Sequence, residues 1–185
     1  MTQASHTEVS AAGHRRAGRF AGRNLIVAAL GLLLLPAAAL NASDLVNQPA
    51  PDFALKSFAG KNLRLSEYRG EVVLVTFWAS WCGRCREQLA KLTALHARHR
   101  DQGFQLLSVS LDDKAERAQD VVDDLRIDFP VLRDQKKTVA RLYDPDTMPL
   151  TIIVDHGGTV RHVHEGYRQG DEALYQTELM ALLAE

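Results

Sequence analysis

The sequence predicts an α/β fold in which a central mixed β-sheet carries helices on both of its faces. Two observations predict this fold: short apolar runs rich in β-branched residues alternate with amphipathic helical segments, and a glycine-containing turn joins the last two extended segments. The chain has 185 residues, which is enough for one domain whose core needs no structural disulfide. The formal net charge of −1 provides no field that would attract nucleic acid, so we expect no nucleic-acid partner.

The first 42 residues have the pattern of an export segment. Basic residues gather at 14–23, and the apolar run 25–40 follows them. That run is shorter than the ~17–25 residues of a typical membrane-spanning helix, and small residues that suit cleavage lie near its end. We therefore expect a signal peptide or membrane anchor over 1–42, a linker over 43–51 and a folded domain over 52–185. If the run 25–40 is retained it would tether the domain to the membrane. In either case we expect the domain to be exported, periplasmic or anchored on the outer face of the cytoplasmic membrane.

Within the domain, the apolar run 72–77 lacks alternation and predicts a strand that is buried on both faces. Leucines then recur with Cys85 at helical spacing, which predicts an amphipathic helix over 83–101. A second strand over 105–111 and a second helix over 114–125 follow. The remaining expected elements are a candidate edge strand at 63–65, an extended segment at 128–132, a helix at 136–143, a strand at 151–154, a turn at 155–158, an alternating strand at 160–164 and a helix at 171–184.

The only two cysteines, Cys82 and Cys85, lie where a predicted buried strand ends and a helix begins. Free N–H groups and the positive end of the helix dipole stabilise an anion there, so Cys82 should ionise below the pKa of ~8.5 of a free thiol. Cys85 lies one turn inside the helix, which screens it from solvent. An exposed attacking thiolate and a buried resolving thiol are what thiol–disulfide exchange requires.

Two other interpretations of the cysteines stand beside this one. A purely structural disulfide is disfavoured because a bridge that closes so short a loop removes little entropy from the unfolded chain. A metal site would need two further ligands, and His162 and His164, which alternate onto one face of a strand, are the candidates. The alternative function is therefore a copper or zinc carrier that uses the dithiol and these two histidines. His96 and His99 belong to a charged helical segment and are expected at the surface.

Residues 77–85 (FWASWCGRC) resemble the active-site signature of the thioredoxin superfamily. The export pattern, the extra segment between 112 and 132 and its Phe-Pro-Val-Leu run make the chain most similar to the TlpA/ResA-like exported thiol–disulfide oxidoreductases. The resemblance covers about residues 47–184. It implies a thioredoxin-like fold with an N-terminal extension and a helix–strand insertion. It also implies that the Cys82–Cys85 disulfide is the redox-active group and that no other cofactor is needed.

The resemblance also implies which residues surround the dithiol. Thr147-Met148-Pro149 precedes a buried strand, and the resemblance implies a cis bond before Pro149 and backbone pairing of Met148 with the substrate. Gly166 matches the loop glycine of the family. The expected substrate groove is mostly apolar and consists of Trp81, Gly83, Met148, Pro149 and Gly166. Arg84 replaces a proline between the cysteines, and its charge is expected to favour the Cys82 thiolate.

Other positions depart from the relatives. Thr76 stands where thioredoxin has a buried acid, so the proton of the resolving thiol must come from elsewhere. Asp112 and Asp113 follow the second strand and are candidates for a proton relay, with a helix cap as the alternative role. Peroxiredoxins need P-x-x-x-T/S-x-x-C, but Val75 and Ala79 occupy the proline and threonine places. We therefore expect no peroxidase chemistry at a single cysteine.

These observations predict an exported thiol–disulfide oxidoreductase, with a reductase favoured over an oxidase. Its expected partners are disulfide-bearing exported proteins and a membrane thiol that donates electrons. The resemblance extends to cytochrome c maturation and related assembly processes, and the residues themselves do not select among these substrates.

Overall fold

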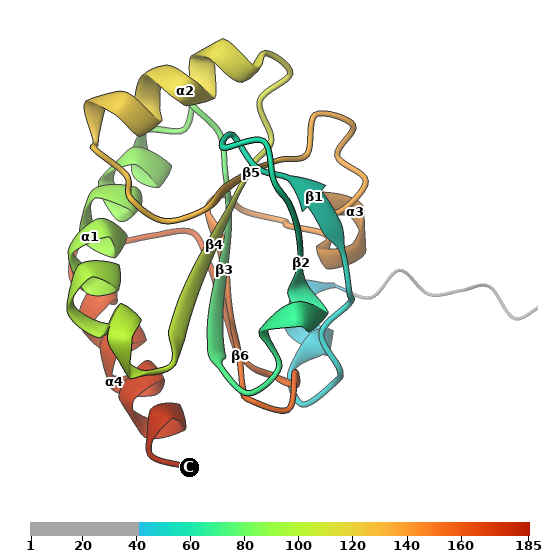
Figure 1. The fold of residues 1–185 in the computed structure, drawn as a ribbon, viewed down its shortest axis with the longest axis vertical. Helices are drawn as coiled ribbons and strands as arrows, with labels where there is room; N and C mark the ends of the chain where they lie inside the picture. Colours follow the sequence, from blue (N-terminus) through green and yellow to red (C-terminus); the bar gives the residue numbers. More distant parts are fainter. Residues whose placement is uncertain (1–40) are drawn as a thin grey trace, which may run out of the picture. The chain divides into compact units, whose positions relative to one another are not determined.

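The computed structural model describes residues 41–185 (Figure 1). The apolar run 25–40 lies outside the described residues, as does all of the expected signal peptide or anchor (1–42) except its last two residues. Among the helices of residues 41–185, none combines the length and the apolar character that crossing a bilayer requires.

A five-stranded mixed sheet forms the centre of the domain, with the strands in the order β5-β4-β3-β6-β7 (Figure 1). Strand β3 pairs in parallel with β4 and antiparallel with β6, and β7 pairs antiparallel with β6. This sheet and its flanking helices confirm the predicted fold class. The strands are β3 (Val72–Trp78), β4 (Phe104–Ser110), β5 (Val131–Arg133), β6 (Leu150–Val154) and β7 (Val160–Glu165).

The central strand β3 supplies apolar side chains to both faces of the sheet. Val73, Val75 and Phe77 belong to one core cluster, whereas Leu74 and Trp78 belong to the other. Successive side chains of a strand point to opposite faces. An unbroken apolar run is therefore what a strand needs when both of its faces are covered.

Helices α1, α2 and α4 cover one face of the sheet, and α3 with the N-terminal segment covers the other (Figure 1). The buried side chains of α1, α2 and α4 share the core cluster that contains Leu74 and Trp78, while the buried Tyr143 of α3 belongs to the opposite cluster. The helices are α1 (Gly83–His99), α2 (Ala115–Asp124), α3 (Ala140–Tyr143) and α4 (Asp171–Leu183), with short 3₁₀ helices η1 (Ala42–Leu45), η2 (Leu65–Tyr68) and η3 (Arg100–Gln102).

The segment that was expected to be a linker is packed onto the domain. Leu45 is buried in the core, and the backbone N–H of Asn47 donates to the carbonyl of Val160 at the start of β7 (2.7 Å). The hydroxyl of Tyr143 donates to the carbonyl of Pro51 (2.6 Å). A small antiparallel hairpin of β1 (Ala54–Lys56) and β2 (Asn62–Arg64) follows, in agreement with the expected edge strand near 63–65.

The histidines expected at the surface are buried, and that prediction was wrong. His96 is 6% exposed and packs between the rings of Phe104 and Phe129, and His99 is 5% exposed. The two histidines come four residues after buried Leu92 and Leu95. Residues four apart share one face of a helix, so the histidines continue the apolar stripe of α1 into the core.

The expected helix at 136–143 is shorter, because α3 begins only at Ala140. Buried Asp134 accepts hydrogen bonds from the backbone N–H groups of Thr138, Val139 and Ala140, with oxygen–nitrogen distances of 2.8–2.9 Å. A carboxylate that accepts hydrogen bonds from three consecutive backbone N–H groups holds this segment in a turn, so the helix starts only after it.

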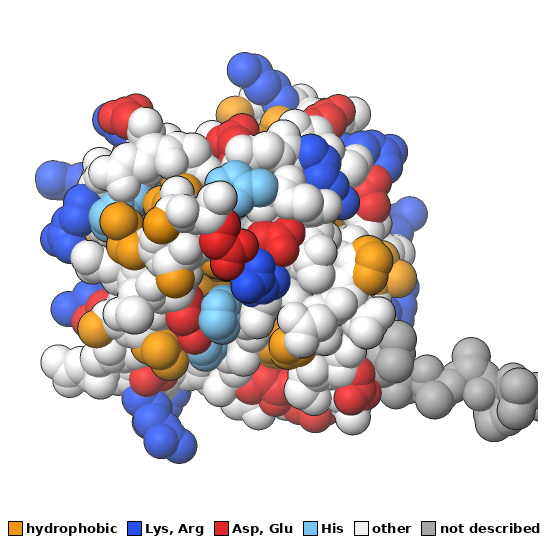
Figure 2. Space-filling view, turned by 90° about the horizontal axis from the view of Figure 1, so that it is seen from below, with side chains coloured by type: hydrophobic (Ala, Val, Ile, Leu, Met, Phe, Trp, Pro, Cys, Tyr) orange, Lys and Arg blue, Asp and Glu red, His pale blue; other side chains and the backbone are white. Residues whose placement is uncertain are grey.

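Acidic and basic side chains are interspersed on the face of the molecule shown in Figure 2. This mixture agrees with the balanced composition of 22 basic and 23 acidic residues. On that face of the described residues, the charges do not add up to a broad field of one sign.

Candidate active site

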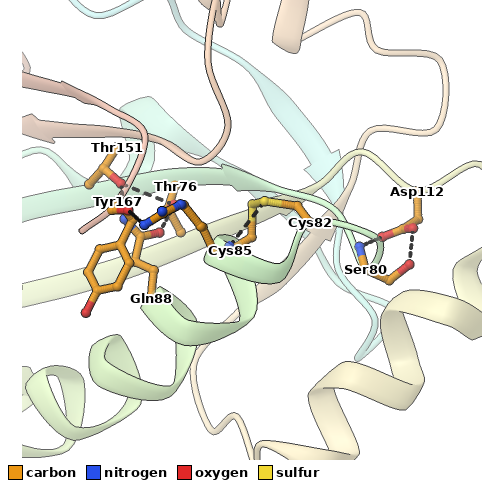
Figure 3. The surroundings of a disulfide bond; sticks show 9 residues. Thr76, Ser80, Cys82, Cys85, Gln88, Asp112, Thr151 and Tyr167 are labelled. Carbon is orange, nitrogen blue, oxygen red and sulfur yellow. Dashed lines mark hydrogen bonds between the residues drawn. A yellow bond between two sulfur atoms is a disulfide. The ribbon is translucent and has the colours of Figure 1, made fainter. Parts of the chain in front are cut away.

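The two cysteines lie at the junction of β3 and α1, where they form a disulfide (Figure 3). Cys82 is the N-cap residue of α1, and its sulfur accepts a hydrogen bond from the backbone N–H of Cys85 (3.2 Å). Cys82 is partly exposed, while Cys85 is completely buried in the core cluster beneath α1. The structure therefore gives one sulfur access to a partner and shields the other. This is the asymmetry that an attacking and a resolving cysteine need.

The segment before β6 lies beside the loop that carries Gly166. The bond between Met148 and Pro149 is cis, as the resemblance implied. The carbonyl of Pro149 accepts a hydrogen bond from the backbone N–H of Gly166 (2.8 Å), and Gly166 has a positive φ of 74°. Met148 and Cys82 both pack against the core cluster that contains Cys85. Met148 and Gly166 also line one hollow with Arg84, the residue between the two cysteines.

A hollow lies beside Arg84, the residue between the two cysteines. This hollow of about 550 Å³, called the Arg84 hollow below, has walls from the start of α1, the segment before β6, β7 and the loop that leads into α4. Met148 and Gly166 line it, whereas Trp81 is 70% exposed outside it and Pro149 is buried. Four charged side chains line this hollow: Arg84, Glu165, Arg168 and Asp171.

A buried polar network lies under the dithiol, centred on Gln88 one turn beyond Cys85 in α1 (Figure 3). The side-chain amide of Gln88 accepts a hydrogen bond from the Thr76 hydroxyl (2.9 Å) and donates to the hydroxyls of Thr151 (2.8 Å) and Tyr175 (3.2 Å). All four residues are completely buried, and burial raises the pKa of the Tyr175 hydroxyl. Around Thr76, this chain therefore has neutral amide and hydroxyl groups.

Sequence reasoning did not identify Gln88. One signal could have done so, because Gln88 is a polar residue on the same helical face as Cys85, Leu89 and Leu92. A polar side chain in an apolar stripe must find buried hydrogen-bond partners.

The two aspartates that were proposed as a proton relay have other partners. Asp112 is 4% exposed and accepts hydrogen bonds from the backbone N–H (2.9 Å) and hydroxyl (2.6 Å) of Ser80 and from the hydroxyl of Ser110 (3.0 Å). Figure 3 places Asp112 and Ser80 on the side of Cys82 away from Gln88. Asp113 is exposed, and its hydrogen bond with Lys137 holds the pKa of its carboxyl below the usual range. Asp112 thus anchors the loop that precedes Cys82.

The two candidate metal-ligating histidines share one carboxylate. His162 Nδ1 and His164 Nε2 lie 3.2 Å and 2.6 Å from the two oxygens of Glu178 on α4, and the imidazole rings are stacked. Within residues 41–185, no three side chains of histidine, cysteine, aspartate or glutamate come together as a metal site. The described part of the chain therefore does not assemble the ligand set that the carrier alternative requires.

Comparisons with known proteins agree with this geometry. The AhpC/TSA family matches residues 46–163. The chain is 29% identical over 121 residues to the thiol-disulfide oxidoreductase ResA of Geobacillus kaustophilus, covering 65% of this chain and 70% of that protein. It is 32% identical over 123 residues to the thioredoxin-like protein YneN of Bacillus subtilis, covering 64% and 71%. Among solved structures, a putative thiol:disulfide interchange protein DsbE from Chlorobium tepidum has a TM-score of 0.72 and 35% identity, covering 75% of this chain and 97% of that one.

Proposed function

We propose that this chain, which belongs to the AhpC/TSA family and is a thioredoxin-like thiol–disulfide oxidoreductase, acts outside the cytoplasm as a reductase of disulfides in exported proteins. The observation that carries the proposal is the disulfide at the start of α1, in which Cys82 is accessible and Cys85 is buried. The dithiol itself stores the two electrons of the reaction, so the proposed chemistry needs no further cofactor.

In the reducing direction, the reaction starts from the dithiol form. The Cys82 thiolate attacks one sulfur of the substrate disulfide, the substrate S–S bond breaks, and the second substrate sulfur leaves as a thiolate that takes up a proton. Cys85 then loses its proton and attacks the Cys82 sulfur of the mixed disulfide. The first substrate sulfur leaves as a thiol, and the Cys82–Cys85 disulfide of the present structure forms. Two electrons have moved from the chain to the substrate.

The helix start supports the first step. A thiolate at Cys82 lies at the N-terminus of α1, where unpaired N–H groups and the helix dipole stabilise negative charge. The hydrogen bond from the Cys85 N–H already points at the Cys82 sulfur (3.2 Å). The anion formed at each turnover therefore needs little reorganisation around it.

The cellular setting is the finer part of the proposal. Basic residues followed by the apolar run 25–40 support export or tethering of the domain to the outer face of the cytoplasmic membrane. A protein that transfers two electrons to each substrate disulfide must have its own Cys82–Cys85 disulfide reduced again. We propose that a membrane thiol protein donates these electrons. Cytochrome c maturation or a related assembly process is the proposed setting, and it is supported only by the resemblance to TlpA/ResA-like proteins.

A trapping experiment tests the proposal. The full-length Cys85→Ser variant should accumulate a covalent mixed disulfide through Cys82 with a disulfide-bearing peptide, because the resolving thiol is missing. Non-reducing electrophoresis and mass spectrometry detect the adduct. The matched Cys82→Ser variant should form far less mixed disulfide with the same peptide, since its remaining thiol, Cys85, is buried. Absence of the adduct, together with stoichiometric copper or zinc that survives dialysis of the wild type, would favour the metal carrier instead.

A further inference from the structure

The Arg84 hollow adjoins the point where a substrate would meet the dithiol. It is lined by Met148 and Gly166 and by Arg84, the residue between the two cysteines. A substrate chain that presents its disulfide to Cys82 and runs past Met148 would therefore place neighbouring side chains in this hollow.

Arg84 is held in a defined position at the wall of the hollow. Its guanidinium Nη1 donates to the backbone carbonyl of Tyr167 at 3.0 Å. Tyr167 is itself buried, and its hydroxyl donates to Glu172 on α4 at 2.7 Å, which fixes the loop that carries the carbonyl. A guanidinium has several N–H donors, so the others remain available for a ligand in the hollow.

The positive charges of the hollow are not neutralised by ion pairs. Among residues 41–185, neither Arg84 nor Arg168 has a carboxylate within ion-pair distance, whereas Arg86, two residues further along α1, is paired with Asp124 (3.2 Å). The carboxylate of Asp171 in the same hollow accepts the backbone N–H of Arg168 (2.7 Å). Glu165, at the end of β7, is the remaining acidic side chain of the hollow.

We infer that the Arg84 hollow is a subsite for an acidic side chain of the protein substrate, and that Arg84 is the residue that selects it. The inference rests on the proposed function, because it assumes a protein disulfide as substrate. A planar guanidinium whose orientation is fixed by a backbone carbonyl binds a carboxylate with two parallel hydrogen bonds more readily than a mobile one. Its position between the cysteines places the acidic side chain close to the reacting cysteine of the substrate.

The test compares three peptide disulfides that differ only in the residues beside the cysteine, which are Glu, Gln or Lys. The reduced full-length protein is mixed with each peptide at low ionic strength, and the second-order rate constant of exchange is measured by stopped flow. The wild type should react about three- to tenfold faster with the Glu peptide than with the Gln peptide, and the ratio should decrease as salt screens the charges. The Lys peptide should be the slowest.

Three variants assign the effect. Arg84→Gln should bring the Glu-to-Gln rate ratio close to one, and Arg86→Gln, which removes the same charge two residues away, should leave the ratio unchanged. Glu165→Gln should raise the ratio, because it removes the opposing charge. Comparing ratios cancels any change in the reactivity of Cys82 itself.

The inference is overturned if Arg84→Gln retains the wild-type ratio, or if Arg86→Gln lowers the ratio as much as Arg84→Gln does. A wild type that exchanges with all three peptides at one common rate also overturns it, while the proposed function stands. A wild type that exchanges with none of the peptides refutes the proposed function itself.

Discussion

Replacing Gln88 with leucine tests whether the buried polar network stabilises the site. Gln88 is completely buried and makes hydrogen bonds with three hydroxyl groups, those of Thr76, Thr151 and Tyr175. Leucine has a similar size but no polar atom. The substitution therefore removes these bonds with little change in packing volume.

The expected loss of unfolding free energy depends on whether each hydroxyl still has a hydrogen-bond partner after Gln88 is replaced. The Thr76 and Thr151 oxygens lie 3.4 Å apart, so these two groups can still bond each other. The buried Tyr175 hydroxyl loses its hydrogen bond from the Gln88 amide, and a buried group that is left without a bond costs about 1–3 kcal/mol. The other two lost bonds add about 1 kcal/mol each, so Gln88→Leu should lower the free energy of unfolding by about 3–5 kcal/mol.

Urea unfolding of the oxidised protein, followed by circular dichroism, measures this free energy. Gln176→Leu is the matched control, because Gln176 lies on the partly exposed side of α4 with a single side-chain bond from Arg98. Its effect should stay within about 0.5 kcal/mol. In the Gln88→Leu background, Tyr175→Phe should cost less than in the wild type by about 1 kcal/mol, because it removes the orphaned hydroxyl.

Two results would refute this reasoning. A loss below about 1 kcal/mol for Gln88→Leu, with an unchanged urea dependence, would mean that the network contributes little net stability. A Tyr175→Phe cost that is equal in the two backgrounds would mean that the Tyr175 hydroxyl does not depend on Gln88.

Three further predictions concern other parts of the chain. Asp112→Asn should lower the unfolding free energy by about 1–3 kcal/mol and leave the pH profile of the exchange rate unchanged, because the two hydrogen bonds from Ser80 go to different carboxylate oxygens and the amide nitrogen that replaces one of these oxygens cannot accept a bond. A displaced profile would support the proton relay. The Tyr167 hydroxyl lowers the pKa of Glu172, so its stabilising effect is present above the unfolded pKa of the carboxyl and is lost as the pH falls through the folded value. Tyr167→Phe should thus lower the melting temperature by about 2–4 °C at pH 7 and by progressively less as the pH falls through the lowered pKa of Glu172, and an effect that grows in acid would contradict this. His99→Leu should raise the unfolding free energy by about 1 kcal/mol, because it removes the buried Nε2, which has no hydrogen-bond partner in the described residues, while the bond that is lost from Nδ1 goes to the exposed Gln102, which can bond water instead. A decrease in the urea midpoint would contradict this prediction.

The sequence by itself determined the elements whose signal is local. The unbroken apolar run predicted β3, and the leucine spacing predicted α1. Together they placed Cys82 at the start of a helix and Cys85 inside it, which was enough to predict thiol–disulfide exchange. These features depend on residues within a few positions of each other, so periodicity and helix-end chemistry suffice to find them.

The tertiary structure decided the partners of the polar side chains. Gln88 bonds hydroxyls that lie 63 and 87 residues further along the chain, and Arg84 bonds the Tyr167 carbonyl 83 residues away. Asp112, which was a relay candidate in the sequence, bonds Ser80 across a separation of 32 residues. Hydrogen bonds between distant segments depend on which face of each element is buried and on how the sheet is ordered. A local pattern shows that a polar group needs a partner, but only the packed fold determines which group lies within 3 Å of it.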